Sequence, residues 1–216
     1  MPGESPSAAQ LNAVTDPFVR ELAALGRLRS YPKNTVFITE GDSSDSVFVV
    51  LSGRVKVFLS DTEGHEVILD TQGPGEYVGE MALDGKPRSA SVMTLESTTF
   101  SVVARDPIRE AIRHNPDFAL DMISKIIDRA RLATSSVKDL ALLDVYGRVA
   151  RLLLNMAVEQ DGKLSVPEKL TQQEIAERVG ASRDMVSRIF RDLTAGGYIK
   201  VENRMITITK KPPARW

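Results

Sequence analysis

The chain of 216 residues contains no cysteine and only two histidines, His65 and His114. The absence of cysteine excludes disulfides, thiolate zinc sites and cysteine-ligated iron–sulfur clusters. Two isolated histidines do not form a metal-binding pattern, so we expect no metal. Haem sensing is not expected either, because His65 falls in an expected hairpin turn and His114 directly precedes Asn115-Pro116.

Long apolar runs are also missing. No segment approaches the roughly 18 apolar residues that a membrane span requires. The N-terminus, Met1 to Ser7, has neither a basic start nor an apolar stretch and so lacks the pattern of a signal peptide. We therefore expect a cytoplasmic protein with no membrane contact. Its hydrophobic fraction of 42% and its length are those of a globular protein with two small domains.

The net charge of −1 conceals an asymmetry between the two ends of the chain. Residues 163–216 contain eleven basic and six acidic residues, a net charge of +5. Residues 1–162 contain the other 17 basic and 23 acidic residues, a net charge of −6. A basic C-terminal piece on an acidic body favours a polyanionic partner for that piece.

The sequence pattern changes along the N-terminal half. Residues 1–15 begin rich in serine, proline, glycine and alanine, and we expect a disordered tail there. Asp16-Pro17 is a good helix start, because an N-cap residue precedes proline at the first helical position. From Val36 to Val103, short β-branched runs alternate with turns marked by the glycines at 41, 53, 64 and 75. This spacing is typical of an antiparallel barrel or roll.

A helical period follows Asp106-Pro107. Six residues recur at alternating spacings of four and three and form a heptad seam with few charges: Ile123, Ile127, Ala130, Thr134, Val137 and Ala141. The seam could pack on its own barrel, but one barrel cannot easily cover so long a stripe. We therefore expect this helix to pair with its twin in a homodimer. We expect a hinge at Val145–Arg148, a helix from Val149 to about Val158 and a loop over 159–169.

Residues 75–92 contain a set of groups that suits a cyclic phosphate. Gly79 allows backbone amides to approach a ligand closely. The stretch from Glu80 to Leu83 can form a short helical turn whose free N–H groups favour an anion. Arg88 supplies forked donors and a fixed charge, and Ser89 adds a hydroxyl donor. The Glu80 carboxylate can accept a hydrogen bond from a ribose hydroxyl.

This segment resembles the phosphate-binding cassette of the cyclic-nucleotide-binding domain. That domain is a β-roll shared by the bacterial cyclic-AMP receptor protein, protein kinase A regulatory subunits and cyclic-nucleotide-gated channels. The resemblance implies that Gly79 and Glu80 engage the ribose, Glu80 through the 2′-hydroxyl. It implies that Arg88, Ser89 and the Ala90 amide engage the cyclic phosphate. Met81 lies within the same cassette and belongs to the expected site.

The resemblance also bears on the base of the ligand. In the receptor protein, two neighbouring hydroxyl residues on the long helix meet the adenine amino group. The corresponding positions here are Ala133 and Thr134, so one hydroxyl is missing, and Thr134 on the seam could reach the partner's ligand. Gln72 places an amide where the pocket wall is commonly apolar, and an amide can pair with guanine or adenine. Cyclic AMP is the expected ligand, with cyclic GMP and cyclic di-GMP as alternatives.

The segment from Lys169 to Phe190 predicts a helix-turn-helix. Thr171 with Glu174 three residues later is a capping box, and Gly180 permits the tight turn. Ser182 caps the second helix. The inner faces of the two helices are apolar: Ile175, Ala176 and Val179 on the first, and Val186, Ile189 and Phe190 on the second.

The outer face of the second helix carries the side chains that can read DNA. A recognition helix contacts base edges with residues near its N-terminus, here Arg183, Asp184, Ser187 and Arg188. Arginine can read guanine, and a carboxylate can accept from cytosine. Two strands around an Asn-containing turn then predict a wing whose Arg204 contacts backbone phosphate. The candidate DNA-contacting set is completed by Thr171, Gln173 and Ser182.

This C-terminal half resembles the superfamily of the receptor protein and the fumarate–nitrate regulator (CRP/FNR). The family match implies that Arg183, Asp184 and Arg188 read bases. Asp184 is one methylene shorter than the receptor protein's glutamate, so the half-site need not be the same. The expected fold is α+β: an N-terminal cyclic-nucleotide-binding β-roll, a long dimerisation helix and a C-terminal winged helix-turn-helix. The expected bounds are 1–15 for the tail, 16–117 for the β-roll, 118–145 for the helix and 146–216 for the DNA-binding domain.

These features predict a transcription regulator whose affinity for double-stranded DNA is controlled by a cyclic nucleotide. A cyclic-nucleotide-regulated enzyme is the main rival class, but no residues remain for a catalytic domain and no catalytic cluster is present, so we expect no enzyme activity. Ligand-independent DNA binding is a further alternative. The family likeness also implies RNA polymerase as a partner, through the loop 159–169 or the surface of the β-roll.

Overall fold

The computed structural model describes residues 4–160 and 163–213. The chain divides into two compact units, which we describe separately. The first comprises Met1–Leu59 and Ile68–Ala130, and the second comprises Ser60–Val67 and Arg131–Trp216. The division along the chain therefore falls inside the long helix, between Ala130 and Arg131.

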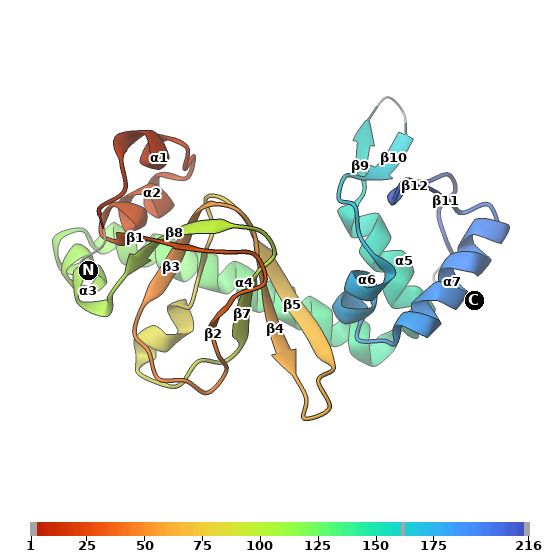
Figure 1. Ribbon diagram of the computed structural model, residues 1–216, viewed down its shortest axis with the longest axis horizontal. Helices are drawn as coiled ribbons and strands as arrows, with labels where there is room; N and C mark the ends of the chain where they lie inside the picture. Colours follow the sequence, from red (N-terminus) through yellow and green to blue (C-terminus); the bar gives the residue numbers. More distant parts are fainter. Residues whose placement is uncertain (1–3, 161–162, 214–216) are drawn as a thin grey trace. The chain divides into compact units, whose positions relative to one another are not determined.

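The first unit contains the predicted β-roll, formed by two four-stranded sheets (Figure 1). One sheet has the strand order β1 (Arg27–Tyr31), β8 (Thr98–Val103), β3 (Val47–Ser52), β6 (Tyr77–Val78). The other has the order β2 (Val36–Ile38), β7 (Ser91–Thr94), β4 (Val55–Ser60), β5 (Glu66–Gln72). A core of seven buried side chains lies within the roll: Ile38, Phe48, Val50, Val55, Val78, Val92 and Phe100. The expected α+β fold and its antiparallel roll are confirmed.

The predicted turn glycines have the backbone conformation that a turn requires. Gly41, Gly53, Gly64 and Gly75 all have φ between +83° and +88°. At Gly53 a Cβ atom would also come within 2.5 Å of the Thr98 hydroxyl oxygen. The turn between β3 and β4 therefore requires glycine for both conformation and space.

The N-terminal segment differs from the expected disordered tail. Within residues 4–15, helix α1 (Ala8–Asn12) begins at a capping box between Ser7 and Gln10. Val14 is buried, and its carbonyl accepts two hydrogen bonds from Arg20, at 2.9 Å and 2.8 Å. The prediction of disorder over 1–15 is wrong here, because these contacts order the segment; residues 1–3 lie outside the described residues. Helix α2 (Pro17–Ala24) begins at the expected N-cap, Asp16.

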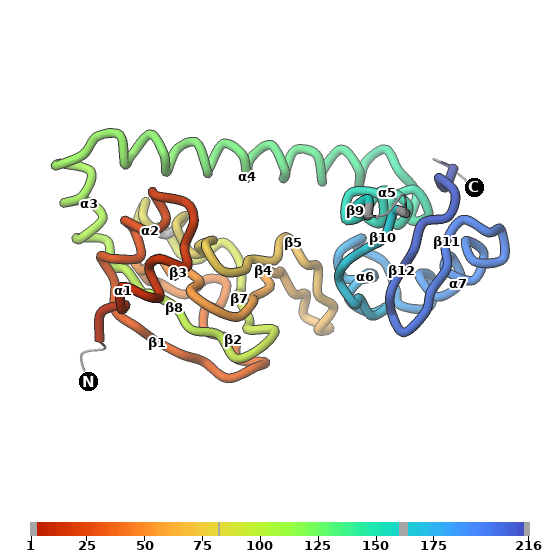
Figure 2. The backbone as a smooth tube through the Cα atoms, turned by 90° about the horizontal axis from the view of Figure 1, so that it is seen from above, coloured from red at the N-terminus to blue at the C-terminus, as the bar shows by residue number. Residues whose placement is uncertain are grey.

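Two helices follow the roll, α3 (Arg105–His114) and α4 (Pro116–Leu142). Phe118 and Met122 pack beside α2 in a second core of the first unit. They are the buried residues of α4, and its later turns expose their side chains. Figure 2 shows α4 as one unbroken helix. Helix α4 begins two residues before the expected start at 118 and ends three residues before the expected end at 145.

The expected hinge at Val145–Arg148 is wrong. These residues form the first turn of helix α5 (Val145–Met156), and the break after α4 falls at Leu143-Asp144. The Asp144 carboxylate caps α5 by accepting from the Gly147 amide at 2.7 Å, which explains why the helix begins earlier than expected. The Arg148 side chain then donates to the carbonyls of Leu143 and Val179, at 3.0 Å and 2.8 Å.

The rest of the second unit is a winged helix-turn-helix (Figure 1). Its elements are β9 (Val158–Gln160), β10 (Lys163–Val166), α6 (Gln172–Val179), α7 (Arg183–Ala195), β11 (Ile199–Glu202) and β12 (Met205–Ile208). The strands form one sheet in the order β11-β12-β10-β9. The expectation of a loop over 159–169 is wrong for β9 and β10: Leu164 to Val166 pair with β12, and Val166 is fully buried.

Candidate functional site

The cassette residues Gly79 and Arg88 are in direct contact. Arg88 Nη1 donates to the Gly79 carbonyl oxygen at 2.7 Å. Gly79 has φ of +89°, and a Cβ atom there would lie 2.5 Å from Arg88 Nη1. Position 79 therefore requires glycine because of this contact with Arg88, a reason different from the approach to a ligand for which the sequence analysis expected it. The short 3₁₀ helix η1 (Glu80–Asp84) follows at once.

Arg88 is buried, with 5% of its surface exposed. Its Nη2 donates to Ser44 Oγ at 2.7 Å and to the Ser46 carbonyl at 2.8 Å. Burial lowers the pKa of the Arg88 guanidinium, while the charges of Asp45 and Glu80 oppose that shift. Its partners in these bonds are neutral oxygens, and Arg88 forms no ion pair among the described residues. The site therefore contains a buried cation to which an anion can bind.

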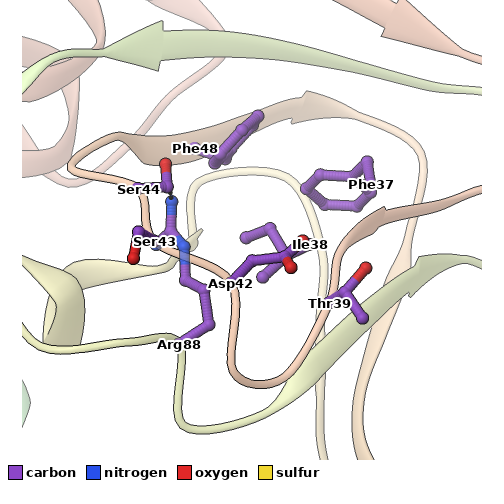
Figure 3. A pocket seen from close by; sticks show the side chains of 8 residues that line it. All are labelled: Phe37, Ile38, Thr39, Asp42, Ser43, Ser44, Phe48 and Arg88. Atoms are coloured by element: carbon purple, nitrogen blue, oxygen red, sulfur yellow. Dashed lines mark hydrogen bonds between the residues drawn. The ribbon is translucent and has the colours of Figure 1, made fainter.

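A cavity of about 210 Å³ adjoins Arg88 (Figure 3). Its lining combines apolar rings, hydroxyl groups and one carboxylate: Phe37, Ile38, Thr39, Asp42, Ser43, Ser44, Phe48 and Arg88. In Figure 3 the Arg88 side chain reaches up to Ser44 at the edge of this cavity.

Glu80 is the second buried charge of the cassette, with 8% of its surface exposed. It forms an ion pair with Arg129 of α4, with 2.6 Å between Oε1 and Nη1. Arg129 also donates to the Tyr77 carbonyl at 2.5 Å and lies over the Tyr77 ring, 4.5 Å from its centre. Burial opposes the Arg129 charge, but the pairing with Glu80, together with the charges of Tyr77 and Asp70, outweighs burial and raises the Arg129 pKa. The sequence analysis did not identify Arg129, since nothing in its local pattern distinguishes it from a surface arginine.

The remaining cassette residues lie together around Ser89. The Ser89 hydroxyl is exposed and donates to the Met81 sulfur at 3.2 Å. Met81 itself is 63% exposed, whereas Ala90 is buried. The structure thus brings Gly79, Glu80, Met81, Arg88, Ser89 and Ala90 into one segment of the first unit.

Two residues considered for the base lie elsewhere. Gln72 is buried, and its amide nitrogen donates to the Asp70 carboxylate at 2.6 Å. The amide that made guanine an alternative is therefore already engaged within the protein. Thr134 is exposed on α4 in the second unit. Its seam neighbours are exposed too, and Val137 has 64% of its surface accessible.

The helix-turn-helix forms through the predicted caps. Thr171 and Glu174 complete the capping box of α6, and Gly180 ends that helix with φ of +61°. The Ser182 hydroxyl oxygen accepts from the Met185 amide at 3.2 Å and so starts α7. The six predicted inner residues of the two helices are all buried.

The outer face of α7 is polar and unpaired. Arg183, Asp184 and Arg188 are exposed and form no ion pair with a described residue, while Ser187 is half-buried. Arg191, three residues after Arg188, extends the same face. It is exposed and was missing from the predicted set.

A cleft of about 550 Å³ lies among the start of α6, the start of α7 and the wing. Thr171, Gln173, Arg183 and Arg204 all contribute to its lining. Asn203 and Arg204 have φ of +51° and +65°, the two-residue turn that joins the strands of a tight hairpin. The structure therefore gathers four of the predicted DNA-contacting residues around one basic cleft.

The described residues contain neither a membrane-spanning helix nor a cluster of metal ligands. No helix there has both the length and the apolar character to cross a membrane. Within the same ranges, no group of three or more His, Cys, Asp or Glu side chains is placed to hold a metal ion.

Two protein-family models match separate parts of the chain, one N-terminal and one C-terminal. Residues 28–115 match the family model of the cyclic nucleotide-binding domain, and residues 147–212 match the Crp-like helix-turn-helix domain. The cAMP-activated global transcriptional regulator CRP of Salmonella typhimurium is 31% identical over 200 residues, which cover 90% of this chain and 95% of that protein. The CRP-like cAMP-activated global transcriptional regulator of Mycobacterium tuberculosis is 32% identical over 184 residues, 83% of this chain and 82% of the relative.

Among solved structures, the c-di-GMP responsive global regulator CLP of Xanthomonas campestris superposes with a TM-score of 0.75. The match covers 94% of this chain and all of that one, with 24% identity. At this identity the likeness concerns the fold alone.

Proposed function

This chain belongs to the CRP/FNR superfamily of bacterial transcription regulators and binds DNA under the control of a cyclic nucleotide. We propose that this nucleotide is cyclic AMP and that the cassette around Arg88 binds it. The observation that carries the proposal is the buried Arg88 guanidinium, whose hydrogen-bond partners among residues 4–160 and 163–213 are all neutral oxygens. A cyclic phosphate supplies the missing negative charge and accepts forked hydrogen bonds.

The rest of the ligand contacts follow from the neighbouring residues. Ser89, released from Met81, donates to a phosphate oxygen, and the Ala90 amide adds a second donor. Glu80 accepts from the ribose 2′-hydroxyl beside its existing partner Arg129. Cyclic AMP is favoured over the guanine nucleotides because two relatives more than 30% identical are cAMP-activated.

Control of DNA binding requires a link from this cassette to the dimer. Arg129 connects Glu80 to α4, the helix that carries the exposed seam. In the proposed homodimer two α4 helices pair along that seam, and Thr134 completes the partner's ligand site. The ligand then stabilises one arrangement of the pair in which two α7 helices lie ~34 Å apart, one turn of DNA.

The DNA contacts divide into two kinds. Arg183, Asp184 and Arg188 on the outer face of α7 read base edges. Thr171, Gln173, Ser182 and Arg204 bind backbone phosphates around the basic cleft, and Ser187 completes the contact face. RNA polymerase is a further proposed partner, for which the β9–β10 hairpin and its exposed Val158 offer a surface.

The proposal is tested by calorimetric titration of the purified protein with cyclic AMP, cyclic GMP and cyclic di-GMP. We expect saturable binding with cyclic AMP at least tenfold tighter than either guanine nucleotide. Tighter binding of a guanine nucleotide would assign the ligand to that nucleotide instead. Binding of none of the three would leave a DNA-binding protein without this control.

A further inference from the structure

Ser44 occupies an unusual position for an exposed residue. It lies in the turn between β2 and β3, and its hydroxyl oxygen accepts a 2.7 Å hydrogen bond from Nη2 of the buried Arg88. An exposed serine is thus hydrogen-bonded to the guanidinium that is proposed to bind the ligand's phosphate. Figure 3 shows this contact at the edge of the cavity.

The charges around this contact favour an anion at Ser44. Arg88 is held by two carbonyl oxygens and one hydroxyl, and it has no ion pair with any residue in the described ranges. Asp42 lines the same cavity, and the charges of Asp45 and Glu80 act on Arg88, but none of these three carboxylates forms an ion pair with it in the described part of the chain. A phosphate carries ≈ −1.5 to −2 charges and three acceptor oxygens, and Arg is its preferred partner.

Both Nη2 hydrogens are already used, by Ser44 and Ser46. A fork onto a phosphate through Nη2 therefore requires that one of these bonds be exchanged. The hydroxyl is the easier of the two to displace, because the Ser46 carbonyl is fixed by the backbone. A group that holds Arg88 on the Ser44 side consequently competes with the ligand for the same donors.

We propose that Ser44 is a phosphorylation site whose phosphate pairs with Arg88 and thereby excludes the cyclic nucleotide. A protein serine kinase transfers the γ-phosphoryl group of ATP: the bond between Ser44 Oγ and phosphorus forms, the bond to ADP breaks, and the hydroxyl proton leaves to a base. The exclusion of ligand rests on the proposed function, whereas the pairing of phosphoserine with Arg88 does not.

Attachment to the chain makes the phosphate a strong competitor. A tethered group acts at an effective concentration in the mM range, which a free ligand must overcome. The cavity beside Ser44 leaves room for the tetrahedral group over the guanidinium. The modified protein also lacks the ribose and base that would reach Glu80 and α4, so phosphorylation withholds the ligand's signal and does not mimic it.

Ser43 provides a matched control. It is exposed, lines the same cavity and makes no side-chain hydrogen bond with any described residue. Phosphoserine is incorporated at position 44 or at position 43 of the full chain by codon suppression. Each protein is then examined by ³¹P NMR titration and by calorimetry with cyclic AMP.

We expect the second pKa of phosphoserine 44 to lie at least 0.5 unit below that of phosphoserine 43, and Arg88→Gln to remove the difference. We expect phosphorylation at 44 to weaken cyclic AMP binding at least tenfold and phosphorylation at 43 to change it less than threefold. Equal phosphoserine pKa values, or equal effects of the two sites on binding, would overturn the proposal. If the unmodified protein binds no cyclic nucleotide, the proposed function fails, and the NMR comparison alone decides whether phosphoserine 44 pairs with Arg88.

Discussion

The Arg129 guanidinium lies 2.6 Å from the Glu80 carboxylate, and this pair connects α4 to the cassette across 49 positions of the sequence. Both charges are largely shielded from water, and Arg129 has further contacts with Tyr77. A ligand that bonds to Glu80 therefore acts on a group that is already attached to α4. In the proposed mechanism, this ion pair transmits the binding of the ligand to the helix that pairs in the dimer.

The strength of this link can be measured by a double-mutant cycle. Arg129→Gln leaves a buried carboxylate without its partner and should lower the free energy of unfolding by about 2 kcal/mol. Adding Glu80→Gln removes the orphaned charge, so the double variant should recover about 1 kcal/mol of that loss. Urea unfolding of the four proteins provides the values. Strictly additive effects would show that the two residues do not interact.

Tyr77 gives a pH dependence. Burial raises the pKa of its hydroxyl to about 12, and that hydroxyl has no hydrogen-bond partner among the residues that the structure describes. A raised folded-state pKa means that the contribution to stability is complete below pH ~10 and is lost as the pH rises towards about 12. Because Tyr77→Phe removes a buried hydroxyl without a hydrogen-bond partner among the described residues, it should raise the free energy of unfolding at pH 7 by about 0.5–1 kcal/mol. It should also lose less stability than the wild type between pH 10 and pH 11. An equal loss in both proteins would argue against this assignment.

The seam on α4 should determine the oligomeric state. Val137 is exposed in the single chain and would be buried between two paired helices in the proposed dimer. A charge at this position should therefore prevent the helices from pairing. Val137→Glu is expected to convert a dimer into a monomer by light scattering at micromolar concentration. Ser135→Glu places the same charge on an exposed position outside the seam and should leave the dimer intact. A dimeric Val137→Glu protein would locate the interface elsewhere.

Two arginines of the basic cleft should differ in what they read. Arg183→Ala should weaken binding to a preferred operator by ~1–3 kcal/mol and relax the preference at one base pair. Arg204→Ala should weaken binding to all sequences alike and reduce the slope of affinity against salt by ~1. Anisotropy titrations over a range of salt concentrations separate these effects. Identical behaviour of the two variants would assign both residues to the phosphates.

Local signals accounted for much of the fold. The turn glycines, the Thr171–Glu174 capping box and the Ser182 cap are decided by a few neighbouring residues, and the structure has each of them. The cassette could be recognised because its close approach of Gly79 to Arg88 requires fixed residue types at fixed spacing.

Most of what the sequence did not predict depends on distant contacts; helix α1 and the early start of α5 are local exceptions. Arg129 acquires its role only through Glu80, and Ser44 only through Arg88. Strand β10 is short and is stabilised by pairing with β12, 40 to 44 positions later. Helix α1 has a composition typical of disorder, and it is ordered by a local capping box beside a buried Val14.

In the proposed mechanism, a cyclic nucleotide bound at Arg88 controls DNA affinity. An operator is first selected from a random-sequence library. Its fluorescence anisotropy is then measured during titration with the wild type and with Arg88→Leu, each with and without cyclic AMP. Wild-type affinity should rise by ~5–150-fold with the nucleotide, the range typical of allosteric coupling. Arg88→Leu should bind the same DNA without responding. A variant that responds as fully as the wild type would contradict the claim.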